Sequence, residues 1–423
     1  MTSRERVISA INHRKPDRVP VDLDATNLTG INSSSLYRLR EYLGLSKHPI
    51  VVKDIFQMLG VVDKDVLDII KPDVVGLNGR YNFIGVKDTG EYSDFNMFDG
   101  TPTKQFKNNV FKKDENGNIF TYPEGDDSVE ACAYMPPTGY YFDNIDRVPD
   151  YIESELNPKE DFANLYKIIS EEDALYYQKE AKRLYEETDL AVIGNLGVAG
   201  LGDVAHLPGP TVKHPKGIRR MDEWLMAHIL YPDYVEEVYE LQTEAALKNL
   251  EIFRQAVGEN IQVVFVSGTD FGTQIGSFIS PNLFKKMYKP RFQRVNDWIH
   301  NNTNWKTFYH SCGSLIDYLD DFVDMGVDII NPVQLSAKGM NPTFLKEKYG
   351  DKLVFWGGGV DTQYMLPFGN PEEIEVEVEK RLEILSTDGG YIFSTIHNIV
   401  GNIPPENIMA MYKAVHKFNG MNI

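Results

Sequence analysis

Short runs of β-branched and aromatic residues recur along the chain, and helical patterns separate most of them. The runs are continuously apolar, which is typical of parallel strands buried on both faces of a sheet. Eight runs meet this description, at 19–25, 73–78, 190–196, 261–268, 306–310, 327–332, 352–357 and 390–395. Helical patterns occupy 33–44, 160–187, 233–256, 282–301, 314–325, 371–386 and 404–418. Eight strands alternating with helices predict an α/β fold, a (β/α)8 TIM barrel that forms a single domain over 1–423.

The rival architecture is a doubly wound open sheet. It would need a dinucleotide-type glycine fingerprint or a clear reversal of strand order. The glycine-rich segment 194–203, "GNLGVAGLGD", lacks the G-x-G-x-x-G spacing. The barrel is therefore the favoured prediction.

Residues 79–158 interrupt the alternation of strands and helices. A hairpin is expected around Asn116-Gly117, and the segment 133–145 is rich in Pro and Tyr. We predict a β-rich inserted subdomain after the second strand. It is either a lid over the barrel mouth or a small β unit that packs on itself.

The bulk composition excludes several classes of protein. A formal net charge of −19 disfavours a nucleic-acid partner, which needs a basic surface. Cys132 and Cys312 are too few for a disulfide framework and fit a reducing compartment. The first residues are charged, unlike a signal peptide, and no apolar run is long enough to span a membrane. We expect a soluble, cytoplasmic protein.

Polar residues gather at the ends of the predicted strands. In a barrel of this kind the carboxyl ends of the strands meet at one face, which predicts a polar active site there. Candidates for catalysis are Asp270, Gln334 and Asp361, although Asp270 could instead cap its loop. Candidates for substrate contacts are Asn27, Asn195, Gln274, Gln363 and Asn398.

His310 and Cys312 are the most informative pair at these strand ends. Two residues apart on extended backbone, their side chains point the same way, and imidazole and thiolate are natural zinc ligands. A helix beginning at Ser314 would favour the thiolate form of Cys312. His397 is the first candidate for a third ligand, followed by Gln334 and Asp361. The alternatives are a small buried cysteine, and histidines that bind substrate or fix loops.

Five segments, in this order, resemble the uroporphyrinogen decarboxylase superfamily: "DRVPVDLD", "GTDFGTQIGSFISP", "HSCGSLIDYLDDFVDMGVDIINPVQ", "VFWGGGVDTQYML" and "GGYIFSTIHNIVGNIPPENI". That superfamily contains the decarboxylase itself and zinc-dependent, corrinoid-linked methyltransferases. The resemblance implies a (β/α)8 barrel. It covers almost the whole chain outside 79–158.

The two branches of the superfamily differ at a few positions, and the residues of this chain at those positions can be compared with each branch. The decarboxylases hold the carboxylates of a tetrapyrrole with arginines after the first strand, whereas residues 21–35 here contain none. The methyltransferases carry a His-x-Cys at the fifth strand end, which His310 and Cys312 match. Their second cysteine follows the eighth strand, where this chain has His397 and Asn398. Either His397 replaces that ligand or the metal is absent.

The resemblance therefore implies a corrinoid-linked methyltransferase. It would move a methyl group between a small methylated substrate, such as a methoxylated aromatic, and a corrinoid, with zinc as a Lewis acid. No D-x-H-x-x-G cobalamin signature is present, so the corrinoid is expected on a partner protein. The alternatives are a metal-free decarboxylase with Asp270 in proton transfer, and a non-catalytic barrel that binds a ligand or corrinoid. The direction of transfer and the oligomeric state, a homodimer included, stay open.

Overall fold

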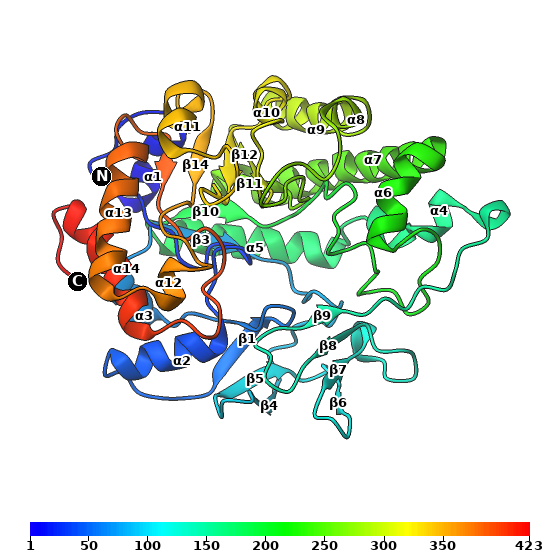
Figure 1. The fold of residues 1–423 in the computed structure, drawn as a ribbon, viewed down its shortest axis with the longest axis horizontal. Helices are drawn as coiled ribbons and strands as arrows, with labels where there is room; N and C mark the ends of the chain where they lie inside the picture. The colour runs from blue at the N-terminus through cyan, green and yellow to red at the C-terminus, as the bar shows by residue number, and fades with distance from the viewer.

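A seven-stranded parallel sheet forms the centre of the protein in the computed structural model, which describes residues 1–423. Its strand order is β15-β14-β13-β12-β11-β10-β3 (Figure 1). The strands are β3 (Val74–Leu77), β10 (Ala191–Gly194), β11 (Val263–Ser267), β12 (Lys306–His310), β13 (Ile329–Asn331), β14 (Val354–Trp356) and β15 (Tyr391–Ile392). Seven of the eight predicted runs are therefore confirmed as strands of one parallel sheet.

The first predicted run, 19–25, does not form a strand. Val21 makes a single parallel bridge to Phe393 beyond β15, and its carbonyl accepts the N–H of Asp73 beside β3 at 2.7 Å. This segment thus reaches both edges of a curled sheet. Pro20 has no N–H to donate, and Asp24 has a φ of +76°, so the extended backbone ends early. The predicted eight-stranded barrel is confirmed only as this curled seven-stranded sheet.

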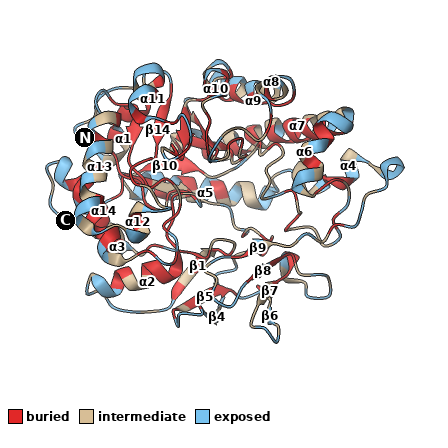
Figure 2. Ribbon diagram, in the orientation of Figure 1, coloured by how far each residue is buried: buried red, intermediate tan, exposed pale blue.

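Helices surround the sheet: most of them cover its outside, while the first one lies at the end where the strands begin, and Figure 2 shows that their buried residues lie mainly on the inner sides. They are α1 (Ser3–Ile11), α2 (Ser33–Tyr42), α3 (Lys64–Ile70), α4 (Pro158–Asp161), α5 (Glu171–Glu187), α6 (Met221–Leu230), α7 (Pro232–Val257), α8 (Pro281–Met287), α9 (Lys289–Asn302), α10 (Leu319–Asp324), α11 (Pro342–Tyr349), α12 (Met365–Phe368), α13 (Pro371–Leu385) and α14 (Pro405–Phe418). Short 3-10 turns occur at η1 (Pro123–Gly125), η2 (Glu153–Glu155), η3 (Ala163–Tyr166) and η4 (Gly258–Asn260). No helix combines the length and the apolar composition needed to cross a membrane.

Helix α13 illustrates why these segments are helical. Asn370 and Glu373 form a reciprocal capping box at its start, where Pro371 occupies the first turn. One stripe of the helix is buried, and it consists of Ile374, Val378, Leu382 and Leu385. The cap therefore fixes where the helix begins, and the stripe fixes which side faces the sheet.

The predicted helix 314–325 is shorter in the structure. α10 begins at Leu319, and the Ser314 hydroxyl donates to the carbonyl of Lys338 instead of capping a helix. Gly313 has a φ of +82° and packs directly on the backbone of Gly272, which holds the chain after Cys312 in a loop. The expected helix start beside Cys312 is therefore wrong.

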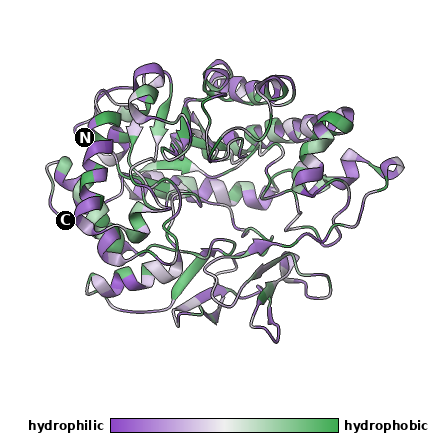
Figure 3. Ribbon diagram, viewed as in Figure 1, coloured by the Kyte–Doolittle hydropathy of each residue, from purple (hydrophilic) through white to green (hydrophobic).

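The inside of the curled sheet is filled at one end only. Inward-facing strand residues such as Phe308, Trp356 and Ile193 pack with Val7 and Ile11 of α1 in one hydrophobic cluster. A larger cluster lies between the outer side of the sheet and the helices, and Figure 3 shows the hydrophobic strands of the centre. α1 thus closes the end where the strands begin, and the end where they finish is left for polar side chains.

Two small sheets lie beside the central sheet, below it in Figure 1. One has the order β2-β1-β5-β4, with β1 (Ile50–Asp54), β2 (Leu59–Gly60), β4 (Tyr92–Asn96) and β5 (Pro102–Phe106). The other comprises β6 (Phe111–Lys113), β7 (Ile119–Thr121), β8 (Ala133–Met135) and β9 (Asp143–Asn144), and β6 and β7 form the expected hairpin around Asn116-Gly117. Because β1 and β2 precede residue 79, the first sheet joins segments from outside and inside 79–158. The reading of 79–158 as an inserted unit or lid stays a prediction.

Asp73 joins the N-terminal segment to the start of β3. Its carboxylate is fully buried and accepts from Arg6, Arg18 and Ser3 at 2.7–2.8 Å. It also accepts the N–H of Val21 at 2.9 Å. One carboxylate therefore holds α1 and the segment that reaches both sheet edges.

We expect Asp73→Asn to lower the free energy of unfolding by about 3–5 kcal/mol, because it leaves Arg18 without its carboxylate partner and removes one of the two carboxylates that pair with the buried Arg6. The midpoint of urea denaturation measures this change. Asp68→Asn is the matched control, since Asp68 pairs with Lys64 on the exposed surface. An unchanged midpoint in Asp73→Asn would contradict the role given to this carboxylate.

Candidate functional site

The alternation of side chains along β12 places His310 inside the curled sheet. Phe308 belongs to the inner cluster and Tyr309 to the outer one, so His310 points inward again. Hydrogen bonding with β13 aligns His310 with Asn331. Cys312 follows two residues later in the loop, at the end of the sheet that α1 does not fill.

His310, Cys312 and His397 form one group. The ligand atoms of the three side chains all lie within 4.8 Å of one another. The Cys312 sulfur is 3.4 Å from Nε2 of His310, and the two imidazole ring centres are 5.4 Å apart. The loop after β15 supplies His397, so residues far apart in the sequence meet at this edge of the sheet.

Asn331 fixes the orientation of the His310 ring. Nδ1 of His310 lies 2.7 Å from Oδ1 of Asn331, whose Nδ2 donates to the carbonyl of Trp356 at 2.9 Å. With its Nδ2 so engaged, Asn331 presents an acceptor, and Nδ1 of His310 carries the proton. Nε2 therefore offers a lone pair toward Cys312 and His397, the arrangement typical of a metal-binding histidine.

Burial keeps both imidazoles neutral at physiological pH. It lowers the pKa of His310 to about 4. Burial, with the nearby His310, lowers the pKa of His397 to about 3. Burial and the charge of Asp270 raise the pKa of Cys312 well above its usual value, so the expected thiolate is not favoured in the protein alone.

The donor set fits a zinc ion. Two neutral imidazole nitrogens and one sulfur are ligands that zinc takes, and three protein ligands leave a fourth position for a substrate atom. His397 makes no side-chain hydrogen bond in the protein, so its ring is free to bind. A cation beside Cys312 would favour loss of the thiol proton, as metals do with coordinating thiols.

Two predicted catalytic residues contact the loop that carries Cys312. Oδ1 of Asp270 accepts the N–H of Cys312 at 2.6 Å and lies 4.0 Å from Nε2 of His310. Burial raises the pKa of Asp270 to about 6. The side-chain oxygen of Gln334 accepts the N–H of Gly313 at 2.6 Å. Both side chains therefore hold the loop in place from either side of it.

Two cavities meet at His397. The cysteine cavity, of about 330 Å³, is lined by Cys312, His397, Gln274, Gln334 and Gln363 among others. The histidine cavity, of about 300 Å³, is lined by His310, His397, Asp270, Asn27 and Asn195 among others. Both are at the small end of the range for ligand sites. The three candidate metal ligands thus lie between two spaces that could each receive a molecule.

The remaining predicted residues differ in how free their side chains are. Gln274 and Gln363 contact each other at 3.2 Å. Asn195 donates to Ala25 and Asn78, and its own Oδ1 is buried without a partner.

The side chains of two other predicted residues form hydrogen bonds within the protein. Asn398 is buried and bonds Gly30, Asn27 and Gln57, so its amide joins two loops. Asp361 lines neither cavity and accepts the N–H of Gln363.

Part of the histidine cavity is formed by residues that the sequence pattern does not predict. Its wall also includes Asp54, Asp203, Phe56, Phe83 and His206. Asp54 ends β1, which has the apolar pattern "IVVKD" and could have been read as a strand. Asp203 ends the glycine-rich segment 194–203, in which the pattern of strand ends predicts a site residue only at Asn195.

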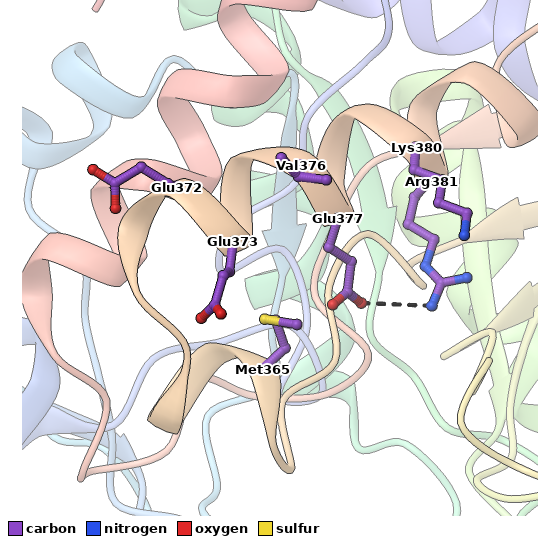
Figure 4. Close-up of a pocket in the computed structure, with 7 residues that line it drawn as sticks. All are labelled: Met365, Glu372, Glu373, Val376, Glu377, Lys380 and Arg381. Carbon is purple, nitrogen blue, oxygen red and sulfur yellow. Dashed lines mark ion pairs between the residues drawn. The ribbon is translucent and has the colours of Figure 1, made fainter.

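A larger hollow, of about 500 Å³, lies on the outer surface between α12 and α13 (Figure 4). Met365 and residues of α13 line it, and Glu377 and Arg381 form an ion pair at 3.5 Å across neighbouring turns. It contains no histidine or cysteine, so none of the three candidate metal ligands lines it. Its size alone therefore does not make it the candidate site.

Comparison with known proteins gives a family and a fold. Residues 146–418 match the family described as "Uroporphyrinogen decarboxylase (URO-D)". The uroporphyrinogen decarboxylase of Geobacter metallireducens is 23% identical over 291 residues, which cover 65% of this chain and 75% of that protein. The uroporphyrinogen decarboxylase of Vesicomyosocius okutanii is 33% identical over only 75 residues, or 18% of this chain and 21% of that protein.

A solved structure resembles the whole chain. It is described as a methyltransferase from Methanosarcina mazei, and the superposition has a TM-score of 0.55 and covers 99% of both chains. The sequence identity is 16%, so this similarity concerns the fold.

We expect Asn331→Ala to weaken zinc binding by about 10–100-fold, the usual effect of removing the outer partner of a histidine ligand. Competition with a chromophoric chelator measures the affinity. Asn301→Ala, on the exposed surface of α9, is the control and should bind zinc like the unmodified protein. Equal affinity in both variants would contradict the orienting role of Asn331.

Proposed function

This chain belongs to the uroporphyrinogen decarboxylase (URO-D) family, and from that premise we propose that it is a zinc-dependent methyltransferase of the corrinoid-linked type. It moves a methyl group between a small methylated molecule and a corrinoid carried by a partner protein. The observation that carries the proposal is the group of His310, Cys312 and His397, whose ligand atoms lie within 4.8 Å of one another. A decarboxylase needs no such set of donors.

The proposal gives each residue of the group a role. His310, Cys312 and His397 hold zinc, and Asn331 keeps Nε2 of His310 turned toward it. Zinc supplies a Lewis acid that stabilises negative charge on the oxygen or sulfur that loses or receives the methyl group. Asp270, 4.0 Å from His310, is the candidate acid or base for a proton at that atom.

The other predicted site residues keep the roles expected of them as proposals. Gln334, Gln274 and Gln363 line the cysteine cavity, and Asn27 and Asn195 line the histidine cavity. Asn398, predicted to contact substrate, and Asp361, predicted to be catalytic, are the exceptions: they line neither cavity and would act by shaping the neighbouring loops. The absence of a cobalamin signature in the chain supports a corrinoid that arrives on a separate protein.

A metal-free decarboxylase is the second candidate, because the curated relatives described above are uroporphyrinogen decarboxylases. Such a substrate carries several carboxylates, which proteins hold with arginine or lysine. Neither cavity has a lysine or an arginine in its wall. This lack of positive charge supports the methyltransferase over the decarboxylase.

We expect one zinc ion per chain in the purified protein, measured by elemental analysis. Cys312→Ala and His397→Ala should each lose most of it, because each removes one of three ligands. Cys132→Ala is the matched control, since Cys132 is the other cysteine and is buried in the hydrophobic cluster of the small sheets. Zinc-free unmodified protein would rule out the proposed metal site.

We expect the zinc-loaded protein to methylate cob(I)alamin from a suitable methyl ether, followed by the change in the visible spectrum. Removing zinc with a chelator should reduce the rate to background, and adding zinc back should restore it. Cys132→Ala should retain the activity that Cys312→Ala loses. Decarboxylation of a porphyrinogen by zinc-free protein would instead establish the second candidate.

A further inference from the structure

The histidine cavity is lined by acidic side chains and lacks basic ones other than histidine. Asp54, Asp203 and Asp270 contribute to its wall, whereas no lysine or arginine does. Lys53 is close in sequence, but its ammonium group pairs with Asp24 at 2.8 Å. The imidazole of His206 is the one basic side chain in the wall besides His310 and His397.

The partners of these carboxylates are neutral. Asp54 is 5% exposed and accepts from the N–H of Gln57 at 2.8 Å and from Nδ2 of Asn27 at 3.1 Å. Asp203 accepts the N–H of Ala205 at 2.9 Å. Burial raises the pKa of both carboxyl groups, because the charges of Lys53 near Asp54 and of His206 near both acids offset its effect only in part.

Aromatic rings and a free acceptor complete this part of the wall. Phe56 and Phe83 stack with their centres 4.4 Å apart, and His206 lies 4.9 Å from Phe83. The faces of such rings attract cations. The buried Oδ1 of Asn195, in the same wall, has no hydrogen-bond partner and can only accept.

We infer that the substrate carries an ammonium group, which binds in the histidine cavity beside Asp54 and Asp203 and against Phe56 and Phe83. The inference rests on the proposed function, since the methylated end of the same molecule would face His310 and His397. Burying an ammonium group is costly unless carboxylates compensate its charge, and this cavity supplies them. The same wall disfavours carboxylate and sulfonate substrates.

The test compares three ligands that share one methoxylated ring and differ in the charge of the side chain. They are methoxytyramine, a cation; homovanillyl alcohol, which is neutral; and homovanillate, an anion. Calorimetric titration of the zinc-loaded protein measures binding without turnover. We expect the cation to bind about tenfold or more tightly than the alcohol, as one charge-assisted hydrogen bond would give. The anion should bind most weakly.

Two conservative variants locate the source of that preference. Asp54→Asn and Asp203→Asn each remove one negative charge and keep the shape of the side chain. Asp203→Asn also keeps the acceptor for the N–H of Ala205, whereas Asp54→Asn keeps one of its two acceptor oxygens. Each variant should therefore reduce the preference for the cation over the alcohol. Asp94→Asn, on an exposed strand away from the cavity, is the control. Thermal melting and zinc content verify that each variant is folded and loaded.

Several results would overturn the inference. One is homovanillate binding as tightly as methoxytyramine, and another is a cation preference that survives both Asn variants. Failure of both methoxytyramine and the smaller tetramethylammonium ion to bind would overturn it as well. The zinc measurements keep the two proposals distinct. If the purified protein holds no zinc but still prefers the cation, only the proposed function is contradicted. If methyl transfer depends on zinc but the cation is not preferred, only this inference is contradicted.

Discussion

The hydrogen-bond ladder between β12 and β13 is the constraint on which the candidate site depends. It aligns His310 with Asn331, so the imidazole and the amide that orients it are neighbours by register. A slip of one residue would turn His310 to the outer side, where Tyr309 now packs among the helices. The position of Cys312, two residues beyond the strand, follows from the same register. The pairing of the two strands thus determines where the side chains of His310 and Cys312 lie.

Much of the fold could be predicted because buried parallel strands leave a strong local pattern. The run 306–310 coincides with β12, and the capped, striped segment 371–386 nearly coincides with α13. The predictions failed where contacts with distant parts of the chain determine the backbone conformation. The segment 19–25 is held by hydrogen bonds to both sheet edges, while Pro20 and the turn at Asp24 stop it from extending. The loop after Cys312 is shaped by its close packing on Gly272, which no helical stripe reveals.

The candidate site likewise has a part that could be predicted from the sequence and a part that could not. The meeting of His310, Cys312 and His397 could be predicted because strand ends converge at one edge of a parallel sheet. Two acids of the histidine cavity, Asp54 and Asp203, could not be placed there from the sequence, since Asp54 comes from the small sheet and Asp203 from an irregular loop. The protonation state of Cys312 could not be predicted from the sequence either. A helix beginning at Ser314 would favour the thiolate of Cys312, but no helix begins there, and burial raises the pKa of the thiol in the folded protein.

His397 belongs to the walls of both cavities. Its ring therefore shapes the two cavities in addition to offering a nitrogen ligand. The imidazole lines two small cavities, one of which is also lined by Cys312 and the other by His310. Shortening the side chain to alanine would enlarge both cavities as well as delete a donor. A replacement of similar bulk, such as glutamine, separates the loss of a ligand from the loss of a wall.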